Sequence, residues 1–318
     1  MWYPAITPFR TGSLAVGDGH ELYWEMCGNP TGSPALFLHG GPGSGCPPNS
    51  RRWFAPDRYC IILFDQRGCG RSTPHASLEH NTTAHVIADI EALRVALEVE
   101  QWLLFGRSWG AALALAYAEA FPERTTAMVL SGVFTARRSE LDWLYRGGAA
   151  HLFPEAWSRF VGFIAEPDRG DLVAAYHARL TCGDAPFEDG AARAWCGWED
   201  AISTLLPGVT PADDGSWRAR ARIQTHYFLH HAFLDEGQLL AQAERLAGIP
   251  GIIVQGRYDA ITPPATAWAL HQAWPASSLQ IVPDAGHDSG EPGTMRALIE
   301  ATDAFASATN SRRHPSTA

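Results

Sequence analysis

Lysine is absent from this chain, and all 24 of its basic residues are arginine. Without a lysine amine the protein cannot form a Schiff base, use a lysine nucleophile or bind phosphate through a P-loop lysine. Acidic residues outnumber basic ones, 34 to 24, which gives a formal net charge of -10. Because an acidic surface repels polyanions, we expect neither nucleic acid nor a membrane as a partner.

Cysteine motifs and long apolar runs are lacking as well. The six cysteines include no C-x-x-C pair and no spacing with histidine typical of a metal site, so we expect free thiols, no metal and no cofactor. No apolar stretch is long enough to span a membrane, and the first residues lack the basic and apolar regions of a signal peptide. These features predict a soluble protein of the cytoplasm.

Short apolar runs and helical patterns alternate along the first 132 residues. After a hairpin at residues 13–26, continuous runs such as 59–64 and 101–105 are typical of strands buried on both faces of a parallel sheet. Residues 83–98 carry apolar side chains at helical spacing. The alternation predicts an α/β fold with a mostly parallel, doubly wound sheet.

The pattern becomes helical and tryptophan-rich between residues 135 and 246, with helices expected at 139–145, 191–205 and 218–234. Strands return at 251–256 and 279–282, before a last helix at 294–306. We therefore expect three parts: a core domain of residues 1–134 and 247–308, an inserted helical cap of residues 135–246, and a disordered tail of residues 309–318.

The stretch Gly106-Arg107-Ser108-Trp109-Gly110 joins an expected strand to an expected helix. A nucleophile elbow needs this G-x-S-x-G spacing, because its central residue has a strained backbone and side chains at the flanking positions would clash. The helix that follows directs its positive end toward the serine oxygen. The same pattern also fits an ordinary turn between strand and helix, but the expected strand before it and the expected helix after it favour the elbow.

A serine nucleophile needs a base, and the base needs an acid to orient it. Asp259 and His287 each follow an expected strand, which gives the order Ser, Asp, His of α/β hydrolases. Asp259 alone fits a helix cap equally well, and Asp284 and Asp288 are rival acids close to His287 in the sequence. We expect Ser108, Asp259 and His287 to form a catalytic triad.

The loop at residues 40–43 is rich in glycine and follows another expected strand. In α/β hydrolases this position supplies one backbone donor of the oxyanion hole, and the residue after the nucleophile supplies the other. The backbone N–H groups of Gly41 and Trp109 are therefore the candidates, although a plain glycine turn is the alternative interpretation of the loop.

Further motifs stand in a fixed order along the chain: His39-Gly-Gly-Pro-Gly, Phe64-Asp-Gln-Arg-Gly-Cys-Gly-Arg-Ser, Trp195-Cys-Gly-Trp-Glu199 and Ala221-Arg-Ile-Gln-Thr-His-Tyr-Phe228. In this combination the chain resembles the prolyl aminopeptidases (proline iminopeptidases) of the α/β-hydrolase superfamily, almost from end to end. The resemblance implies release of an N-terminal proline or a similar small residue from a small peptide or amide through an acyl-enzyme, under a helical cap.

In that family two carboxylates of the cap hold the free amine of the substrate. Glu199 matches the first, whereas Gln224 occupies the second position, and a neutral amide attracts an ammonium less strongly than a carboxylate does. Phe134 and Tyr145 match positions that line the proline pocket. Arg107 is a further departure, because the family usually has glycine before the serine.

Two other functions stay open at this point. One is a related amidase or esterase, serving secondary metabolism, whose altered recognition is signalled by Gln224 and Arg107. The other is a binding protein without turnover on a hydrolase scaffold, which the complete triad disfavours. The sequence indicates no particular oligomeric state.

Overall fold

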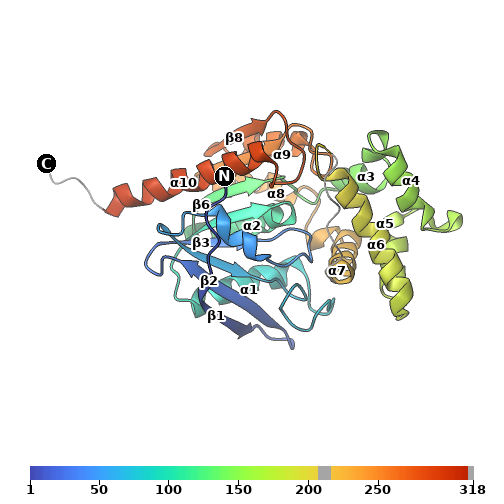
Figure 1. Ribbon diagram of the computed structural model, residues 1–318, viewed down its shortest axis with the longest axis horizontal. Helices are drawn as coiled ribbons and strands as arrows, with labels where there is room; N and C mark the ends of the chain where they lie inside the picture. Colours follow the sequence, from blue (N-terminus) through green and yellow to red (C-terminus); the bar gives the residue numbers. More distant parts are fainter. Residues whose placement is uncertain (207–215, 314–318) are drawn as a thin grey trace.

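An eight-stranded sheet forms the centre of the computed structural model, which describes residues 1–206 and 216–313 (Figure 1). The strands lie in the order β1-β2-β4-β3-β5-β6-β7-β8. β1 and β2 form the expected antiparallel hairpin, β2 pairs antiparallel with β4, and all other neighbours are parallel. The strand bounds are β1 (Pro8–Ala15), β2 (Glu21–Gly28), β3 (Ser33–Leu38), β4 (Tyr59–Phe64), β5 (Trp102–Arg107), β6 (Thr125–Ser131), β7 (Gly251–Gly256) and β8 (Ser277–Val282).

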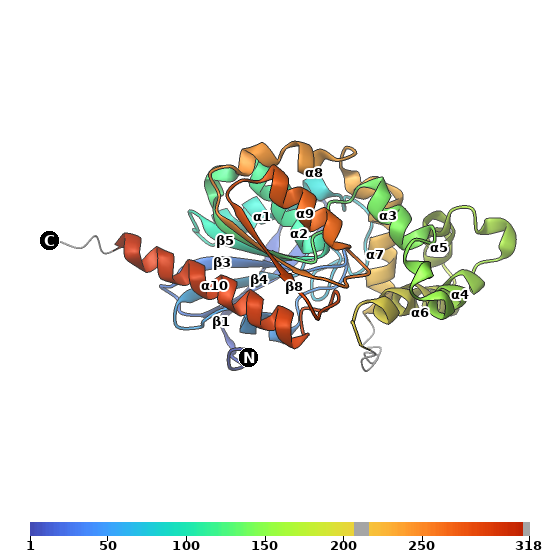
Figure 2. The ribbon, with the colours of Figure 1, turned by 90° about the horizontal axis from the view of Figure 1, so that it is seen from above.

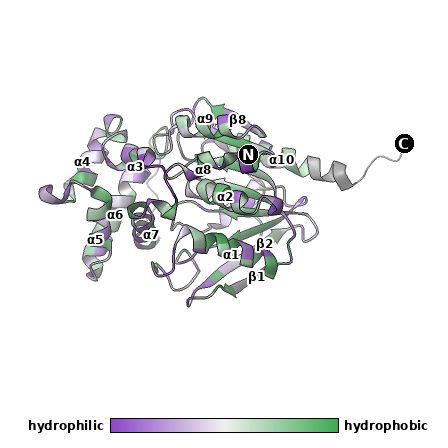
Figure 3. Ribbon diagram, turned by 180° about the vertical axis from the view of Figure 1, so that it is seen from behind, coloured by the Kyte–Doolittle hydropathy of each residue, from purple (hydrophilic) through white to green (hydrophobic). Residues whose placement is uncertain are grey.

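Helices cover both faces of the sheet because successive side chains of a strand point to opposite faces. In β5, Leu104 packs with α1 (Thr83–Ala96), α2 (Trp109–Ala120) and α9 (Pro264–Ala273) in one buried cluster. Its neighbours Leu103 and Phe105 pack instead with α10 (Pro292–Arg313) in a second cluster. Figure 2 shows the sheet between these layers, and Figure 3 shows hydrophobic residues along the strands. The predicted doubly wound arrangement is confirmed.

Most of the remaining helices gather beyond one end of the sheet (Figure 1). They are α3 (Arg138–Tyr145), α4 (Pro154–Gly162), α5 (Leu172–Leu180), α6 (Ala185–Ile202) and α7 (Trp217–Leu229), while the short α8 (Gln238–Ala241) packs near α2 and α9. Short 3-10 helices are η1 (Pro48–Trp53), η2 (Pro122–Arg124), η3 (Ala149–His151), η4 (Glu166–Asp168), η5 (His231–Phe233) and η6 (Ala243–Leu246). Helices α3 to α7 form the expected helical cap, and we keep residues 135–246 as its proposed bounds.

Aromatic rings form the interior of the cap. Trp195 stacks on Tyr145 with 4.6 Å between ring centroids, and Phe160 stacks on Tyr176 at 4.7 Å. Trp143 has a different role, because its Nε1 donates to the backbone oxygen of Ala260 at 2.8 Å and so ties the cap to the core.

Several predicted element ends were wrong. The helix predicted at 191–205 begins at Ala185, where the Asp184 side chain accepts a hydrogen bond from the N–H of Phe187 and Pro186 lies in the first turn. The helix predicted at 218–234 ends at Leu229, because residues 231–233 adopt positive φ angles of 51°, 53° and 54° without any glycine.

The predicted disordered tail, residues 309–318, is helical as far as Arg313. Helices usually end at or before the residue that precedes a proline, and the first proline beyond this helix is Pro315. Residues 314–318 lie outside the described range. Among the described residues, no helix combines the length and the apolar character needed to cross a bilayer.

Glu119, near the end of α2, carries a testable consequence for stability. Its side chain is buried, and within the described part of the chain neither carboxylate oxygen has a hydrogen-bond partner. Burial raises the pKa of this carboxyl from 4.5 to about 8, so the folded protein holds a proton that the unfolded chain releases at lower pH. Stability should therefore fall as the pH rises from about 4.5 to about 8.

Glu119→Gln should remove this fall, so that the variant has a higher Tm than the wild type at pH 9 and a smaller difference from it at pH 5. Thermal denaturation at both pH values measures this, with the exposed Glu123→Gln as a control. If Tm falls by the same amount between pH 5 and pH 9 in the wild type and in Glu119→Gln, Glu119 is not the source of the pH dependence of stability.

Candidate active site

Ser108 lies at the tip of the turn between β5 and α2. Its φ of 54° and ψ of -121° are strained for a residue with a side chain. A Cβ at Gly106 would lie 2.3 Å from the backbone oxygen of Gly110, and one at Gly110 would lie 2.0 Å from that of Leu38. Only glycine fits at either position, so the turn has the geometry expected of a nucleophile elbow.

A cavity of about 290 Å³ opens over this turn. Ser108, Arg107 and His287 line it from the core, and Glu199, Gln224 and Phe228 line it from the cap. The structure thus brings the serine, the histidine and both predicted amine-binding positions to one cavity.

His287 and Asp259 form a hydrogen-bonded pair, with 2.8 Å between Nδ1 and Oδ2. The buried Asp259 also accepts hydrogen bonds from the N–H of Thr262 at 2.7 Å and from Nε2 of Gln255 at 2.9 Å. Because Nδ1 of the imidazole faces Asp259, Nε2 is the ring nitrogen left to accept a proton. A Cβ on Gly132 would lie 2.7 Å from Cε1 of His287, so this glycine leaves the space that the ring occupies.

Both oxyanion candidates belong to segments next to Ser108. Trp109 is the first residue of α2, so its N–H has no acceptor within the helix. Gly41 has a φ of 110°, and a Cβ on its neighbour Gly40 would lie only 3.4 Å from Cβ of Ser108. The glycine-rich loop therefore passes close to the serine, as an oxyanion hole requires.

Gln66 joins the side chain of Trp109 to His39, which precedes the glycine-rich loop, and the sequence did not reveal this role. Its Oε1 accepts a hydrogen bond from Nε1 of Trp109, and its Nε2 donates to the backbone oxygen of His39, each at 3.0 Å. The backbone N–H of Gln66 also donates to Nε2 of His39 at 3.0 Å. The sequence feature that could have indicated this role is the Asp-Gln-Arg-Gly motif after β4, in which Gln66 is the second residue.

Glu199 is buried in the cap wall of the cavity. Its Oε1 accepts hydrogen bonds from the hydroxyl of Tyr145 at 2.6 Å and from Nε2 of Gln224 at 2.7 Å. Burial raises the pKa of the Glu199 carboxyl, while Arg220, Tyr145 and Gln224 act in the opposite direction.

The Gln224 amide makes three hydrogen bonds. Its Nε2 also donates to the backbone oxygen of Gly41 at 3.0 Å, and its Oε1 accepts from Nε1 of Trp195 at 2.7 Å. One side chain thus joins the cap carboxylate Glu199 to the loop that carries an oxyanion candidate.

Comparisons with known proteins identify the family to which this chain belongs. The family of the alpha/beta hydrolase fold matches residues 34–294. A proline iminopeptidase of Xylella fastidiosa (strain 9a5c) is 52% identical over 308 residues, which cover 95% of this chain and 98% of that protein. A proline iminopeptidase of Arabidopsis thaliana is 48% identical over 95% of this chain and 81% of that protein. This chain belongs to the proline iminopeptidase family.

Solved structures confirm the fold. A haloalkane dehalogenase loop variant (DbeA-M1) from Bradyrhizobium elkanii superposes with a TM-score of 0.67 at 19% identity, covering 96% of this chain and 99% of that chain. VinJ superposes with a TM-score of 0.65 at 18% identity, covering 95% of this chain and 99% of that chain. At such identities the likeness concerns the α/β-hydrolase fold alone.

The positions matched to the family's proline pocket differ in their placement. Phe134 lines the cavity, with its ring 5.9 Å from that of Phe228. Tyr145 is not among the described residues that line this cavity. Its hydroxyl donates a hydrogen bond to Oε1 of Glu199, which does line the cavity. Within the described residues, Tyr145 is thus placed to support the carboxylate instead of forming the wall.

Arg220, on α7, is a cavity residue that the sequence did not single out. Its guanidinium lies 2.9 Å from Asp200 and 3.6 Å from Oε2 of Glu199. A cation so close offsets part of the negative charge of Glu199.

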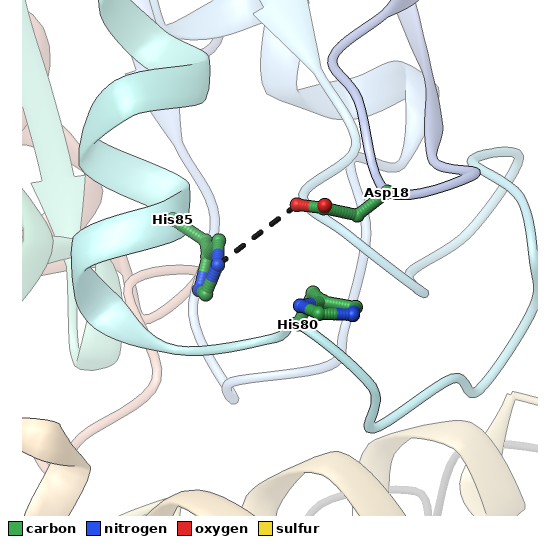
Figure 4. A group of neighbouring side chains, drawn as sticks. All are labelled: Asp18, His80 and His85. Atoms are coloured by element: carbon green, nitrogen blue, oxygen red, sulfur yellow. Dashed lines mark ion pairs between the residues drawn. The ribbon is translucent and has the colours of Figure 1, made fainter.

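A second group of titratable side chains, Asp18, His80 and His85, lies apart from the cavity lining (Figure 4). Their possible ligand atoms lie within 4.8 Å of one another, and His85 Nε2 is 4.0 Å from Asp18 Oδ2. Arg67 also approaches that oxygen, at 3.5 Å. Since a cation already faces the carboxylate, we interpret the group as a contact between the β1–β2 turn and the start of α1.

Proposed function

We propose that this protein releases N-terminal proline from peptides by acyl transfer to Ser108. The observation that carries the proposal is the buried carboxylate of Glu199 in the wall of the cavity onto which Ser108 and His287 open. A free secondary amine is the feature that distinguishes N-terminal proline, and a buried carboxylate is the group that holds its charged form.

The proposed reaction uses the residues of the core. Ser108 Oγ attacks the prolyl carbonyl carbon while Nε2 of His287 takes the hydroxyl proton, and Asp259 keeps the imidazole oriented. The N–H groups of Gly41 and Trp109 stabilise the oxyanion, and losing one such donor typically costs about 3–4 kcal/mol of transition-state stabilisation. His287 then protonates the departing amine, and water releases proline from the acyl-enzyme in the reverse sequence.

A substrate panel tests the proposal. We expect kcat/KM for a prolyl arylamide to exceed that for the N-acetylprolyl arylamide by about tenfold or more, because acetylation removes the charge that pairs with Glu199. An alanyl arylamide and phenyl acetate complete the panel. Faster turnover of the acetylated amide or the ester would favour the amidase or esterase instead.

One contact favours that second candidate. The Gln224 amide already donates to Oε1 of Glu199 at 2.7 Å and so occupies one oxygen of the carboxylate that a substrate amine would use. An uncharged substrate would leave this hydrogen bond in place.

Gln224→Glu separates the two candidates further. The variant places two carboxylates in contact, which costs stability in the empty cavity and is relieved when an ammonium binds between them. We expect a lower Tm together with a gain of about fivefold or more in kcat/KM for the free-amine substrate. Gln242→Glu, outside the cavity, serves as a control. Equal or lower free-amine activity in Gln224→Glu would contradict the amine site.

We also propose that the protein acts in the cytoplasm. All six cysteines are free, and five of them are buried, as is usual in a reducing compartment.

A further inference from the structure

Arg107 is the charged residue nearest to the nucleophile in the sequence. It ends β5 immediately before Ser108 and lines the cavity, with 29% of its side chain exposed. Its neighbours belong to the core: the guanidinium lies over the ring of Trp53, 5.6 Å from its centroid, and Nη2 lies 3.9 Å from Oδ1 of Asp288. Arg107 and Glu199 thus stand on different walls of the cavity.

The charge of Arg107 is incompletely compensated. A separation of 3.9 Å from Asp288 is too long for a hydrogen bond, and Asp288 is half exposed and accepts instead from the N–H of Gly290 at 2.9 Å. Nε of Arg107 is buried and has no partner among the described residues. Burial lowers the pKa of this guanidinium, and the nearby charge of Asp288 acts in the opposite direction. Arginine remains charged in proteins, so an anion that enters the cavity would gain a partner here.

In an acyl transfer, the part of the substrate before the scissile bond and the part after it extend in opposite directions from Ser108. With the amine held at the cap by Glu199, the leaving part points away from the cap wall. In a dipeptide the leaving part is a single amino acid, whose carboxylate lies about one residue length, 3.8 Å between Cα atoms, beyond the reacting carbonyl. Arg107 precedes Ser108 directly and has a long side chain that can span this distance.

We propose that Arg107 binds the carboxylate of the leaving amino acid, so that the protein selects prolyl dipeptides with a free C-terminus over amidated or longer ones. This inference rests on the proposed function and names its substrate class. Guanidinium and carboxylate are matched in geometry and pair through two hydrogen bonds. Amidation abolishes the negative charge, and each added residue moves the carboxylate farther from Arg107.

The test compares kcat/KM for prolyl-alanine and prolyl-alanine amide, in the wild type and in Arg107→Met. The wild type should prefer the free acid by about tenfold. The preference should fall toward one in Arg107→Met and should also shrink at high salt, since the pair is partly exposed. Asp288→Asn removes a competing anion and should increase the preference. The ratio is the readout because damage to the fold or to the triad lowers both rates together.

Arg146→Met is the matched control, because Arg146 lies in the exposed part of the cap and pairs with Asp142. It should keep the wild-type ratio. Equal rates for the two peptides in the wild type, or an unchanged ratio in Arg107→Met, overturn the carboxylate site while leaving the proposed function intact. Hydrolysis of neither peptide by protein that still cleaves phenyl acetate overturns both.

Discussion

Ser108→Ala should lower kcat by about a millionfold, the loss expected when the nucleophile of a complete triad is removed. The chemistry is lost because no other hydroxyl occupies the strained turn between β5 and α2. Hydrolysis of the prolyl arylamide measures the rate, and a fluorophosphonate probe reports the reactive serine directly. The residual rate should come from the oxyanion donors and substrate binding alone.

Ser139→Ala is the control for this experiment, because Ser139 is exposed at the start of α3. It should retain both turnover and labelling. Labelling of folded Ser108→Ala at the wild-type rate would place the nucleophile elsewhere. If the folded wild type is not labelled, the binding-protein alternative gains support.

Asp259→Asn should lower kcat by about 10⁴-fold. The carboxylate accepts hydrogen bonds from Nδ1 of His287, the N–H of Thr262 and the amide of Gln255. An asparagine would turn an NH₂ group toward some of these donors and would favour the wrong tautomer of His287. Activity measured across the pH range should show the loss at every pH, since the defect is in orientation.

Asp284→Asn is the informative comparison, because Asp284 was one of the two rival acids close to His287 in the sequence. We expect it to change kcat by no more than a few fold. Equal losses in the two variants would show that the bond between Asp259 and His287 is not the one that matters in turnover.

The core of the site was predictable because each of its parts follows a strand. In a parallel sheet the carboxyl ends of the strands share one edge, so Ser108, Asp259 and His287 were expected to meet, and the pair of Asp259 and His287 has the expected geometry. The glycines of the elbow were recognisable for a related reason, since a close backbone approach excludes every larger residue.

The cap was less predictable because its contacts join segments that are distant in the chain. The partner of Gln224 across the cavity is Gly41, 183 residues away, and the position of Arg220 beside Glu199 depends on how α6 packs on α7. Neither contact leaves a local pattern. The break after α7 was missed for another reason, as no glycine or proline marks the positive φ angles at residues 231–233.

The double attachment of Gln224 has a consequence for how the site responds to its substrate. An amine that displaces the Gln224 amide from Glu199 also disturbs the side chain that holds the oxygen of Gly41. Under the proposed function, the group that binds the substrate's first residue and the loop that carries an oxyanion donor are therefore connected through one side chain. A substitution at Gln224 changes both contacts at once, so we expect it to change KM and kcat together.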